Sequence, residues 1–213
     1  MKYASYRLTD DPYIPSYVML GKQESPVWRQ ARWDTGEYRE FIVKNGCGHC
    51  CAAMALTLHG VKVDPHREFA LCRALWGEPG EGEGNWQSVA GIVKILRHHG
   101  VPADYFGIPD PERTAAHIEG ALKDGKQVIF WSQPSPAFPE NPFSKNAHYV
   151  MAVGYTEGGE ILIANSSEVA APLGVQTVSI DTIRRALYRG AAPADVTWGL
   201  LDLPRSGGYV VVG

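Results

Sequence analysis

The chain has 213 residues, of which 45% are apolar and 20% charged, values typical of a packed soluble globule. A formal net charge of −3 gives no electrostatic signature of binding to nucleic acid or to an anionic membrane, and no apolar run approaches the roughly 20 residues that span a bilayer. We therefore expect no nucleic-acid partner and no membrane partner. The length fits one large domain or two small lobes around a cleft.

The first 25 residues are rich in Tyr and Pro. We expect them to form an irregular N-terminal arm that lies on the rest of the domain. The start of this segment lacks the basic and then apolar layout of a secretory signal. With Met1 as the native first residue, the expected location is cytoplasmic.

Four helices are predicted before residue 126. The first, residues 50–59 (CCAAMALTLH), is apolar on almost every face, which indicates burial in the middle of the protein. Gly60 follows it as a stop signal. Three further helices are expected at residues 65–76, 86–99 and 111–124.

The second half of the chain changes character. Short branched or aromatic runs bounded by turn residues predict strands at residues 101–108, 126–133, 148–155, 160–166 and 196–204, and an edge strand at residues 207–213. A helix opened by Asp181 as its N-cap is expected over residues 179–190. Helices that precede strands in this way predict an α+β fold, with a helical lobe packed against an antiparallel sheet.

We expect residues 1–213 to form a single domain. Its parts are the N-terminal arm at residues 1–25, a mainly helical lobe over residues 26–125 and a mainly β lobe over residues 126–213. A cleft between two such lobes is the expected place for a functional site.

Three of the four cysteines lie in the segment VKNGCGHCCAAMAL, residues 43–56. This clustering is poor geometry for a disulfide framework, so we expect free thiols in a reducing compartment. The letters CGHC resemble the dithiol of the disulfide-isomerase branch of the thioredoxin family, but a thioredoxin-like site follows a long strand within a βαβ unit. A zinc site needs a second ligand pair, which Cys72 alone does not supply. Cys51 and Cys72 are expected to be buried small apolar residues.

Cys47 differs from its neighbours because Gly46 and Gly48 flank it and permit a tight turn from a loop into a helix. Its sulfur is therefore expected over the first turn of a buried helix. At that place, unpaired N–H groups and the helix dipole favour a thiolate and can bind an oxyanion. Cys47 is the candidate nucleophile, and a nucleophilic cysteine needs a base nearby.

His148 is the candidate base among the seven histidines. It opens the most apolar strand of the chain, directly after a long loop. The turn TEGGE predicts that this strand and the next form a hairpin, and one register places Asn165 on the face of His148, where its amide can orient the imidazole. A slip of one residue would place Asn165 on the other face. Gln30 is either a surface residue or an oxyanion donor alongside the Cys47 N–H.

Taken in this order, the motifs resemble the C39-like family of papain-like cysteine peptidases, the bacteriocin-processing peptidases and their relatives. The resemblance rests on Gln30 and Trp33, then on GCG at residues 46–48 and AAMAL at residues 52–56, and later on GKQVIFW, HYVMAVGY and EILIANS. It covers about residues 26–167. It implies a papain-like fold with the active site in the cleft between the two lobes.

The resemblance also implies a set of catalytic residues: Cys47 as nucleophile, His148 as general base and acid, Asn165 as orienting residue and Gln30 as oxyanion donor. Three positions depart from the family's pattern. His49 stands where Pro is usual, Asn165 stands where Asp is common, and Cys50 is an additional cysteine about one helical turn from Cys47. Neutral Asn165 gives less support to an imidazolium, and Cys50 permits a reversible disulfide with Cys47.

The expected function is hydrolysis of a peptide or related amide bond through an acyl-enzyme on Cys47. The substrate is then a peptide or protein, and no metal or organic cofactor is needed. Three alternatives stay open: an acyl transferase or cyclase on the same fold, a thiol–disulfide oxidoreductase that uses Cys47 and Cys50, and a catalytically silent domain that binds a peptide. Loops 77–86 and 132–147 either shape the substrate groove or are ordinary surface connections.

Overall fold

The computed structural model describes three short strands near the N-terminus and much of the chain from residue 46 onward. The described residues are 4–7, 16–20, 23–27, 46–61, 63, 65–77, 88–108, 110–134, 138–145, 147–166, 175–187 and 208–213. For the three N-terminal strands only the backbone is described. Gln30, Trp33 and the strand expected at residues 196–204 lie outside the described residues.

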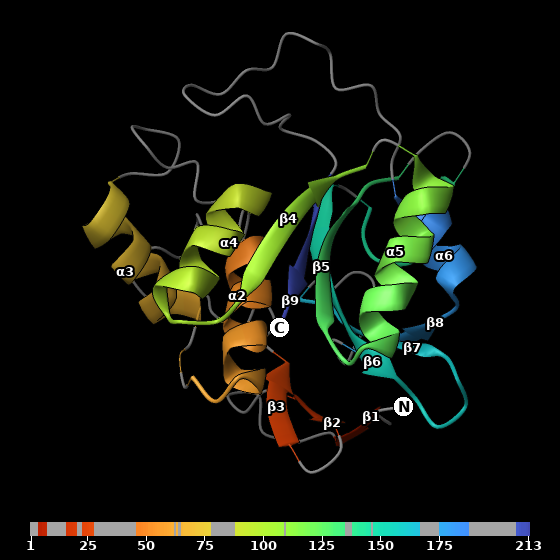
Figure 1. Ribbon diagram of the computed structural model, residues 1–213, viewed down its shortest axis with the longest axis horizontal. Helices are drawn as coiled ribbons and strands as arrows, with labels where there is room; N and C mark the ends of the chain where they lie inside the picture. The colour runs from red at the N-terminus through yellow and green to blue at the C-terminus, as the bar shows by residue number, and fades with distance from the viewer. Residues whose placement is uncertain are drawn as a thin grey trace, which may run out of the picture.

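A six-stranded antiparallel sheet forms the centre of the structure (Figure 1). In spatial order its strands are β4 (Ala103–Gly107), β9 (Gly208–Val212), β5 (Gln127–Ser132), β6 (His148–Tyr155), β7 (Ile161–Ala164) and β8 (Val175–Val178). Strand β9 lies inside the sheet, between β4 and β5, so the expectation of an edge strand at residues 207–213 is wrong. All five residues of β9 are buried, and its apolar run suits an interior position.

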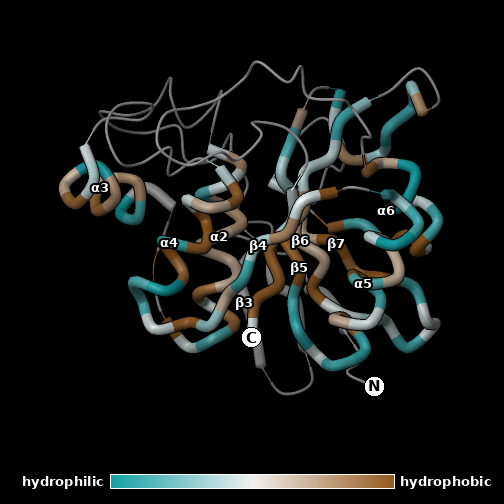
Figure 2. Tube along the Cα trace, turned by 45° about the horizontal axis from the view of Figure 1, so that its top comes forward, coloured by the Kyte–Doolittle hydropathy of each residue, from teal (hydrophilic) through white to brown (hydrophobic). Residues whose placement is uncertain are grey.

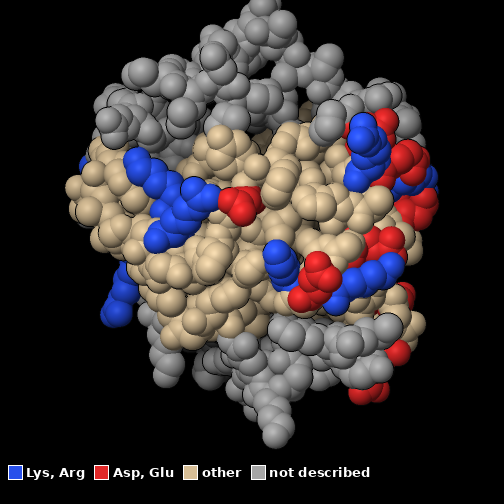
Figure 3. Space-filling view, viewed as in Figure 1, with Lys and Arg blue, Asp and Glu red and all other residues tan. Residues whose placement is uncertain are grey.

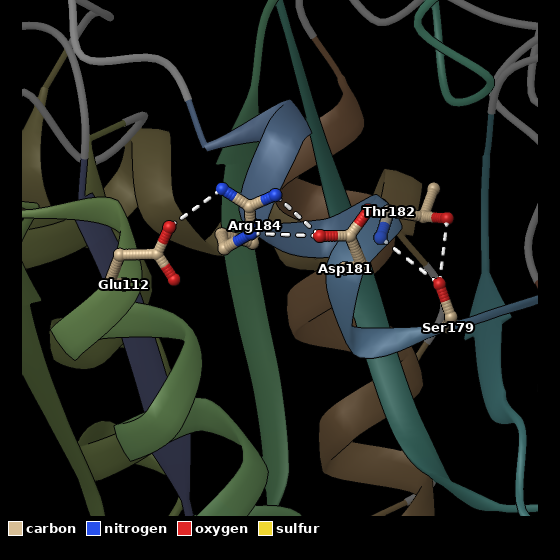
Figure 4. Close-up of polar contacts among 5 residues, drawn as sticks. All are labelled: Glu112, Ser179, Asp181, Thr182 and Arg184. Atoms are coloured by element: carbon tan, nitrogen blue, oxygen red, sulfur yellow. Dashed lines mark hydrogen bonds and ion pairs between the residues drawn. The ribbon is translucent and has the colours of Figure 1, made fainter.

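Five helices are described: α2 (Cys47–Leu58), α3 (Pro65–Trp76), α4 (Val89–His98), α5 (Pro111–Lys123) and α6 (Ile180–Ala186). They confirm the predicted helices, with α2 extended at its start to Cys47. The N-cap of α6 is Ser179, whose Oγ accepts a hydrogen bond from the N–H of Thr182 at 3.2 Å (Figure 4). The expectation of Asp181 as the cap is wrong, because its carboxylate accepts from Nε of Arg184 at 2.9 Å instead.

The sheet has a helical layer on each face (Figure 1). Helices α2 and α4 pack on one face, with α3 against α2, and α5 and α6 pack on the other face. Arg184 of α6 and Glu112 of α5 form an ion pair at 2.7 Å that joins the two helices of the second layer (Figure 4). The fold is α+β, as predicted, but α5 lies across the sheet from the other helices with which it was grouped in the expected helical lobe.

The central strands are buried on both faces. In β6, Met151 and Val153 belong to the core under α2 and α4, whereas Val150 and Ala152 belong to the core under α5 and α6. Because successive side chains of a strand point to opposite faces, a strand covered on both sides needs an uninterrupted apolar run. Figure 2 shows such apolar stretches along β5, β6 and β7.

Helix α2 is buried along nearly its whole length and packs against β6. It ends before Gly60, whose φ of +83° lies in the left-handed region that favours glycine. The N–H of Gly60 donates to the carbonyl of Thr57 at 3.0 Å, and the N–H of Val61 donates to the carbonyl of Leu56 at 2.9 Å. These two bonds form a Schellman motif, which confirms the predicted stop.

The N-terminal segment contains regular structure. Strands β1 (Ala4–Arg7), β2 (Ser16–Leu20) and β3 (Gln23–Val27) form a three-stranded antiparallel sheet near α2 (Figure 1). The expected irregular arm at residues 1–25 is therefore wrong. The prolines misled the prediction: Pro26 lies in β3, an edge strand, where a residue without an N–H is tolerated.

Charged side chains of both signs are mixed on the surface. On the face drawn in Figure 3, the described Lys and Arg residues lie close to Asp and Glu residues at several places. The guanidinium of Arg97 donates to the carbonyl of Ala103 at 2.9 Å and forms an ion pair with the carboxylate of Asp104. In the part of the chain that is described, no helix has the length and the apolar character needed to cross a bilayer.

Candidate active site

Cys47 is the first residue of helix α2. Gly46 precedes it as the N-cap residue without a side chain that can cap the helix, and the N–H of Cys50 donates to the carbonyl of Gly46 at 2.9 Å. The thiol of Cys47 is partly buried. Burial raises the pKa of this thiol, and the backbone N–H groups of Tyr149, Gly48 and Cys47 lower it by a smaller amount. The net shift is upward, so the N–H groups at the start of α2 favour the thiolate, as expected, but burial outweighs them in the free protein.

The first turn of α2 lies against the start of β6. The sulfur of Cys47 is close to the N–H of Tyr149, the residue that follows His148. A Cβ atom at Gly48 would lie 3.5 Å from the Tyr149 ring and 3.5 Å from Ile92. This packing brings the thiol of Cys47 to the residue next to His148.

His148 is the first residue of β6, and Asn165 directly follows β7. A β-bulge between these two strands determines which face of the sheet the Asn165 side chain lies on. Near the turn, Tyr155 pairs with Ile161, whereas beyond the bulge Met151 pairs with Ala164. The register therefore shifts by one residue between the turn and the far end of the hairpin. Without this shift, Asn165 would face the side of the sheet opposite to His148.

With the shift, the two side chains meet. The Nε2 atom of His148 lies 2.9 Å from Oδ1 of Asn165, and both residues are buried. The amide nitrogen of Asn165 donates to the carbonyl of Phe143 and to Oε1 of Gln176, each at 2.9 Å. Because a backbone carbonyl only accepts hydrogen bonds, the atom that faces Phe143 must be the NH₂ group. The oxygen of Asn165 therefore faces His148, which places the proton of a neutral imidazole on Nε2 and leaves Nδ1 as the acceptor.

Residues 138–145 hold the loop that closes over this pair. The ring of Phe143 is fully buried, with its centroid 5.6 Å from that of Phe130. The side chain of Asn141 donates to Oγ of Ser132 at 2.7 Å and accepts from the N–H of Phe143 at 2.9 Å. Ser132 pairs with His148 across β5 and β6. The carbonyl of Phe143 is thus held in place beside Asn165.

The imidazole of His148 is uncharged at neutral pH. Burial lowers its pKa to about 4, although the hydrogen bond with Asn165 acts in the opposite direction. The raised pKa of the Cys47 thiol and the lowered pKa of His148 both favour the uncharged form of the group. In the free protein both groups are neutral, and a proton must move between them before the sulfur carries a charge.

The other cysteines lie in the core. All four are free thiols, and Cys50, Cys51 and Cys72 are fully buried. Burial raises the pKa of Cys50, a charge on Cys47 raises it further, and the hydroxyl of Ser166 lowers it. Cys72 donates to Oε1 of Glu68 on the same helix at 3.7 Å. The buried positions of Cys51 and Cys72 confirm their prediction as core residues.

His49 packs inside the protein between α2 and α3. It is buried, and its ring meets that of Phe69 edge-on with centroids 5.4 Å apart. Burial lowers its pKa to about 3, so it is neutral at physiological pH. His49 therefore contributes to the packing of α2 on α3.

Gln30 lies outside the described residues, so its position relative to Cys47 stays a prediction. Among the residues that the structure describes, no cluster of three or more His, Cys, Asp or Glu side chains is arranged to hold a metal ion.

Gln176 and the carbonyls of Pro142 and Phe143 were not found from the sequence. The Nε2 atom of Gln176 donates to the carbonyl of Pro142 at 2.7 Å. Backbone carbonyls carry no sequence signal, and Gln176 lies in a short polar strand. The pairing of Gln176 with Ile163 in β7 is what brings it next to Asn165.

Comparison with known proteins identifies a family for this sequence. The Peptidase_C39 like family matches residues 22–181, more than half of the chain. The peptidase domain of Streptococcus ComA, a bifunctional ABC transporter involved in a quorum sensing pathway, is 12% identical, with a TM-score of 0.47 over 80% of this chain and 92% of that chain. A double glycine motif protease from an AMS/PCAT transporter, solved with the leader peptide, is 16% identical, with a TM-score of 0.43 over 78% of this chain and 82% of that chain.

No curated protein matches the sequence. The family match extends through α2 and β5 to β8, which carry Cys47, His148 and Gln176, and includes Asn165. The chain therefore belongs to the Peptidase_C39 like family and is a C39-like cysteine peptidase with a papain-like fold.

Proposed function

We propose that this peptidase hydrolyses a peptide bond through an acyl-enzyme on Cys47, with a peptide or protein as its substrate. His148 acts as general base and then as general acid, and Asn165 orients its imidazole. The N–H of Cys47 and the side chain of Gln30 bind the oxyanion, the latter on its position in the family's motif. The hydrogen bond between His148 and Asn165, beside the thiol at the start of α2, carries this proposal.

The reaction begins with two neutral groups. The sulfur of Cys47 attacks the carbonyl carbon of the substrate while its proton passes to Nδ1 of His148, the ring nitrogen that Asn165 leaves available. When the tetrahedral intermediate collapses, the C–N bond breaks and His148 returns that proton to the leaving amine. A water molecule then attacks the thioester, gives one proton to His148 and releases the acid, and the proton returns to the sulfur.

Because Cys47 and His148 are neutral in the free protein, the bound substrate must help to stabilise their charged forms. Because burial opposes a charge on Cys47 and on His148, a charged pair forms only when the oxyanion site and the bound substrate stabilise it. Asn165 supports the transient imidazolium through its amide oxygen. This support is weaker than that of a carboxylate, which fits a base that is charged only during the reaction.

Turnover of a peptide library tests the proposal. Cys47→Ala and His148→Ala should each reduce cleavage by at least about 1,000-fold, because each removes a group that reacts directly. Cys72→Ala is the matched control, since it removes another buried free thiol far along the chain and should leave cleavage unchanged in a folded protein. Retained cleavage in Cys47→Ala would refute the proposal.

Hydrolysis must also be separated from acyl transfer on the same fold. Turnover in water enriched in ¹⁸O should place one heavy oxygen in the new carboxylate of each product. A product without the label, joined to an added amine, would show instead that the acyl-enzyme passes its acyl group to a nucleophile other than water.

A further inference from the structure

Asn165 is held by a second amide side chain. Gln176, on β8, accepts a hydrogen bond from Nδ2 of Asn165 at 2.9 Å and donates one from its Nε2 to the carbonyl of Pro142 at 2.7 Å. Asn165 in turn donates to the carbonyl of Phe143 and faces His148 with its oxygen. The result is a continuous chain of hydrogen bonds from a surface loop to the imidazole.

The direction of every bond in this chain is fixed by two backbone groups. The carbonyl of Pro142 accepts only, so the nitrogen of Gln176 must face it and its oxygen must face Asn165. The carbonyl of Phe143 also accepts only, so the nitrogen of Asn165 must face it. If the Asn165 amide turned over, its oxygen would meet two acceptors at once, in a buried place where unpaired polar atoms are costly.

We propose that Gln176 is a positioning residue that acts on His148 through Asn165, and that the consecutive carbonyls of Pro142 and Phe143 set the polarity of this chain. The inference rests on the proposed role of His148 as base. Its consequence is that His148 carries its proton on Nε2 and keeps Nδ1 available to the thiol of Cys47. It also explains why Asn is suited to position 165, because a carboxylate there has no hydrogen to offer to Phe143 or Gln176.

Three variants separate the parts of this chain. Gln176→Met keeps most of the side-chain volume and removes both hydrogen bonds. Gln176→Glu keeps an acceptor for Asn165, loses the donor to Pro142 and adds a negative charge near the imidazole. Gln127→Met is the matched control, because Gln127 also lies in the six-stranded sheet and its Oε1 lies 2.9 Å from Nε2 of another histidine, His59.

The first readout is the tautomer of His148, measured by long-range ¹H–¹⁵N correlation on protein labelled with ¹⁵N-histidine. The signals of His148 are identified by their loss in His148→Gln. In the wild type we expect a protonated Nε2 and an unprotonated Nδ1. In Gln176→Met the two nitrogen shifts should move toward each other as the other tautomer becomes populated, and in Gln127→Met they should stay in place.

The second readout is kinetic. Gln176→Met should lower kcat for peptide cleavage roughly 3- to 10-fold with KM nearly unchanged, the effect of losing one or two hydrogen bonds behind the base. In Gln176→Glu the added charge should raise the pKa of His148, seen as an upward shift of the acid limb of the pH profile. A role limited to stability would leave the tautomer and kcat of folded Gln176→Met unchanged.

Wild-type values of kcat and of both nitrogen shifts in folded Gln176→Met and Gln176→Glu would overturn the inference. So would a wild-type His148 with its proton on Nδ1. The tautomer is measured without substrate, so it tests the polarity of the chain even if cleavage is absent. Loss of cleavage in Cys47→Ala tests the proposed function separately.

Discussion

The Nε2 atom of His148 lies 2.9 Å from Oδ1 of Asn165, although 17 residues separate them along the chain. A one-residue register shift between β6 and β7 produces this contact. The bulge thus places Asn165, at the end of an apolar hairpin, where its side chain can orient the imidazole of His148. Burial of the same pair keeps the imidazole neutral at physiological pH.

The pH dependence of cleavage should reflect this neutrality. Because the pKa of His148 is lowered to about 4, the base is already deprotonated at pH 5, and kcat/KM should show no inflection near pH 6.5. Removing the hydrogen bond in Asn165→Leu removes the influence that raises this pKa, so the acid limb should move to lower pH while the rate falls. The profile is measured only where circular dichroism shows a folded protein. An inflection between about pH 6 and 7 that disappears in His148→Ala would contradict the neutral resting state.

Cys50 should not take part in the chemistry. Its thiol is fully buried, whereas that of Cys47 is only partly buried, so a substrate carbonyl reaches Cys47 and not Cys50. Cys50→Ala should retain cleavage within about threefold of the wild type, with a small loss of stability. Loss of activity in Cys50→Ala, together with retained activity in His148→Ala, would favour a dithiol oxidoreductase instead.

The stability of the protein should decrease in acid because two histidines are buried in neutral form. The pKa of His49 is lowered to about 3 and that of His148 to about 4, from an ordinary value of 6.5. Below pH 6.5 the unfolded chain binds protons at these sites and the folded chain does not. The free energy of unfolding should therefore be largest above pH 6.5 and fall by up to about 1.4 kcal/mol per pH unit for each histidine as the pH decreases toward 4.

Urea unfolding at a series of pH values measures this slope. His49→Phe removes one of the two groups and should reduce the slope by about 1.4 kcal/mol per pH unit. His98→Gln is the matched replacement of a histidine at an exposed position, the end of α4. Equal slopes in the wild type and in His49→Phe would show that His49 is not held neutral.

Removal of the Phe143 ring should lower both the stability of the protein and its catalytic activity. Its buried ring fixes the loop whose carbonyl orients Asn165, so Phe143→Ala should lower the free energy of unfolding by about 3–5 kcal/mol and reduce kcat as well. Phe106→Ala, at a position that is 37% exposed, should cost much less stability and leave kcat unchanged. Urea unfolding and peptide cleavage on the same samples give both quantities. A stable Phe143→Ala with wild-type kcat would show that the loop does not support the site.

The sequence predicted those parts of the fold that depend on local pattern. The apolar helix α2, its stop at Gly60 and the hairpin of β6 and β7 follow from periodicity and turn residues. The interior position of β9 was missed, because the neighbours of a strand depend on contacts between distant segments. The N-terminal sheet was missed because prolines suggested irregular structure, although an edge strand accepts Pro26.

The candidate site was predictable in its residue types and less so in its electrostatics. Cys47 was suggested by the glycines that flank it, His148 by its place at the start of an apolar strand, and Asn165 by one register of the hairpin. The upward shift of the Cys47 pKa was not predictable, because it depends on how deeply the first turn of α2 is buried. Gln176 was equally hidden, since its role depends on strand pairing and on two backbone carbonyls.

The proposed reaction requires that Cys47 forms the acyl-enzyme with His148 as its base. The most direct measurement is acid quenching of the reaction with a cleavable peptide, followed by peptide mapping by mass spectrometry. We expect one acyl adduct, on Cys47, that appears within the first turnover and is absent in His148→Ala. An adduct on Cys50 or Cys51 would contradict the role of Cys47 as nucleophile. So would cleavage that proceeds with no adduct on Cys47 at any quench time while His148→Ala remains active.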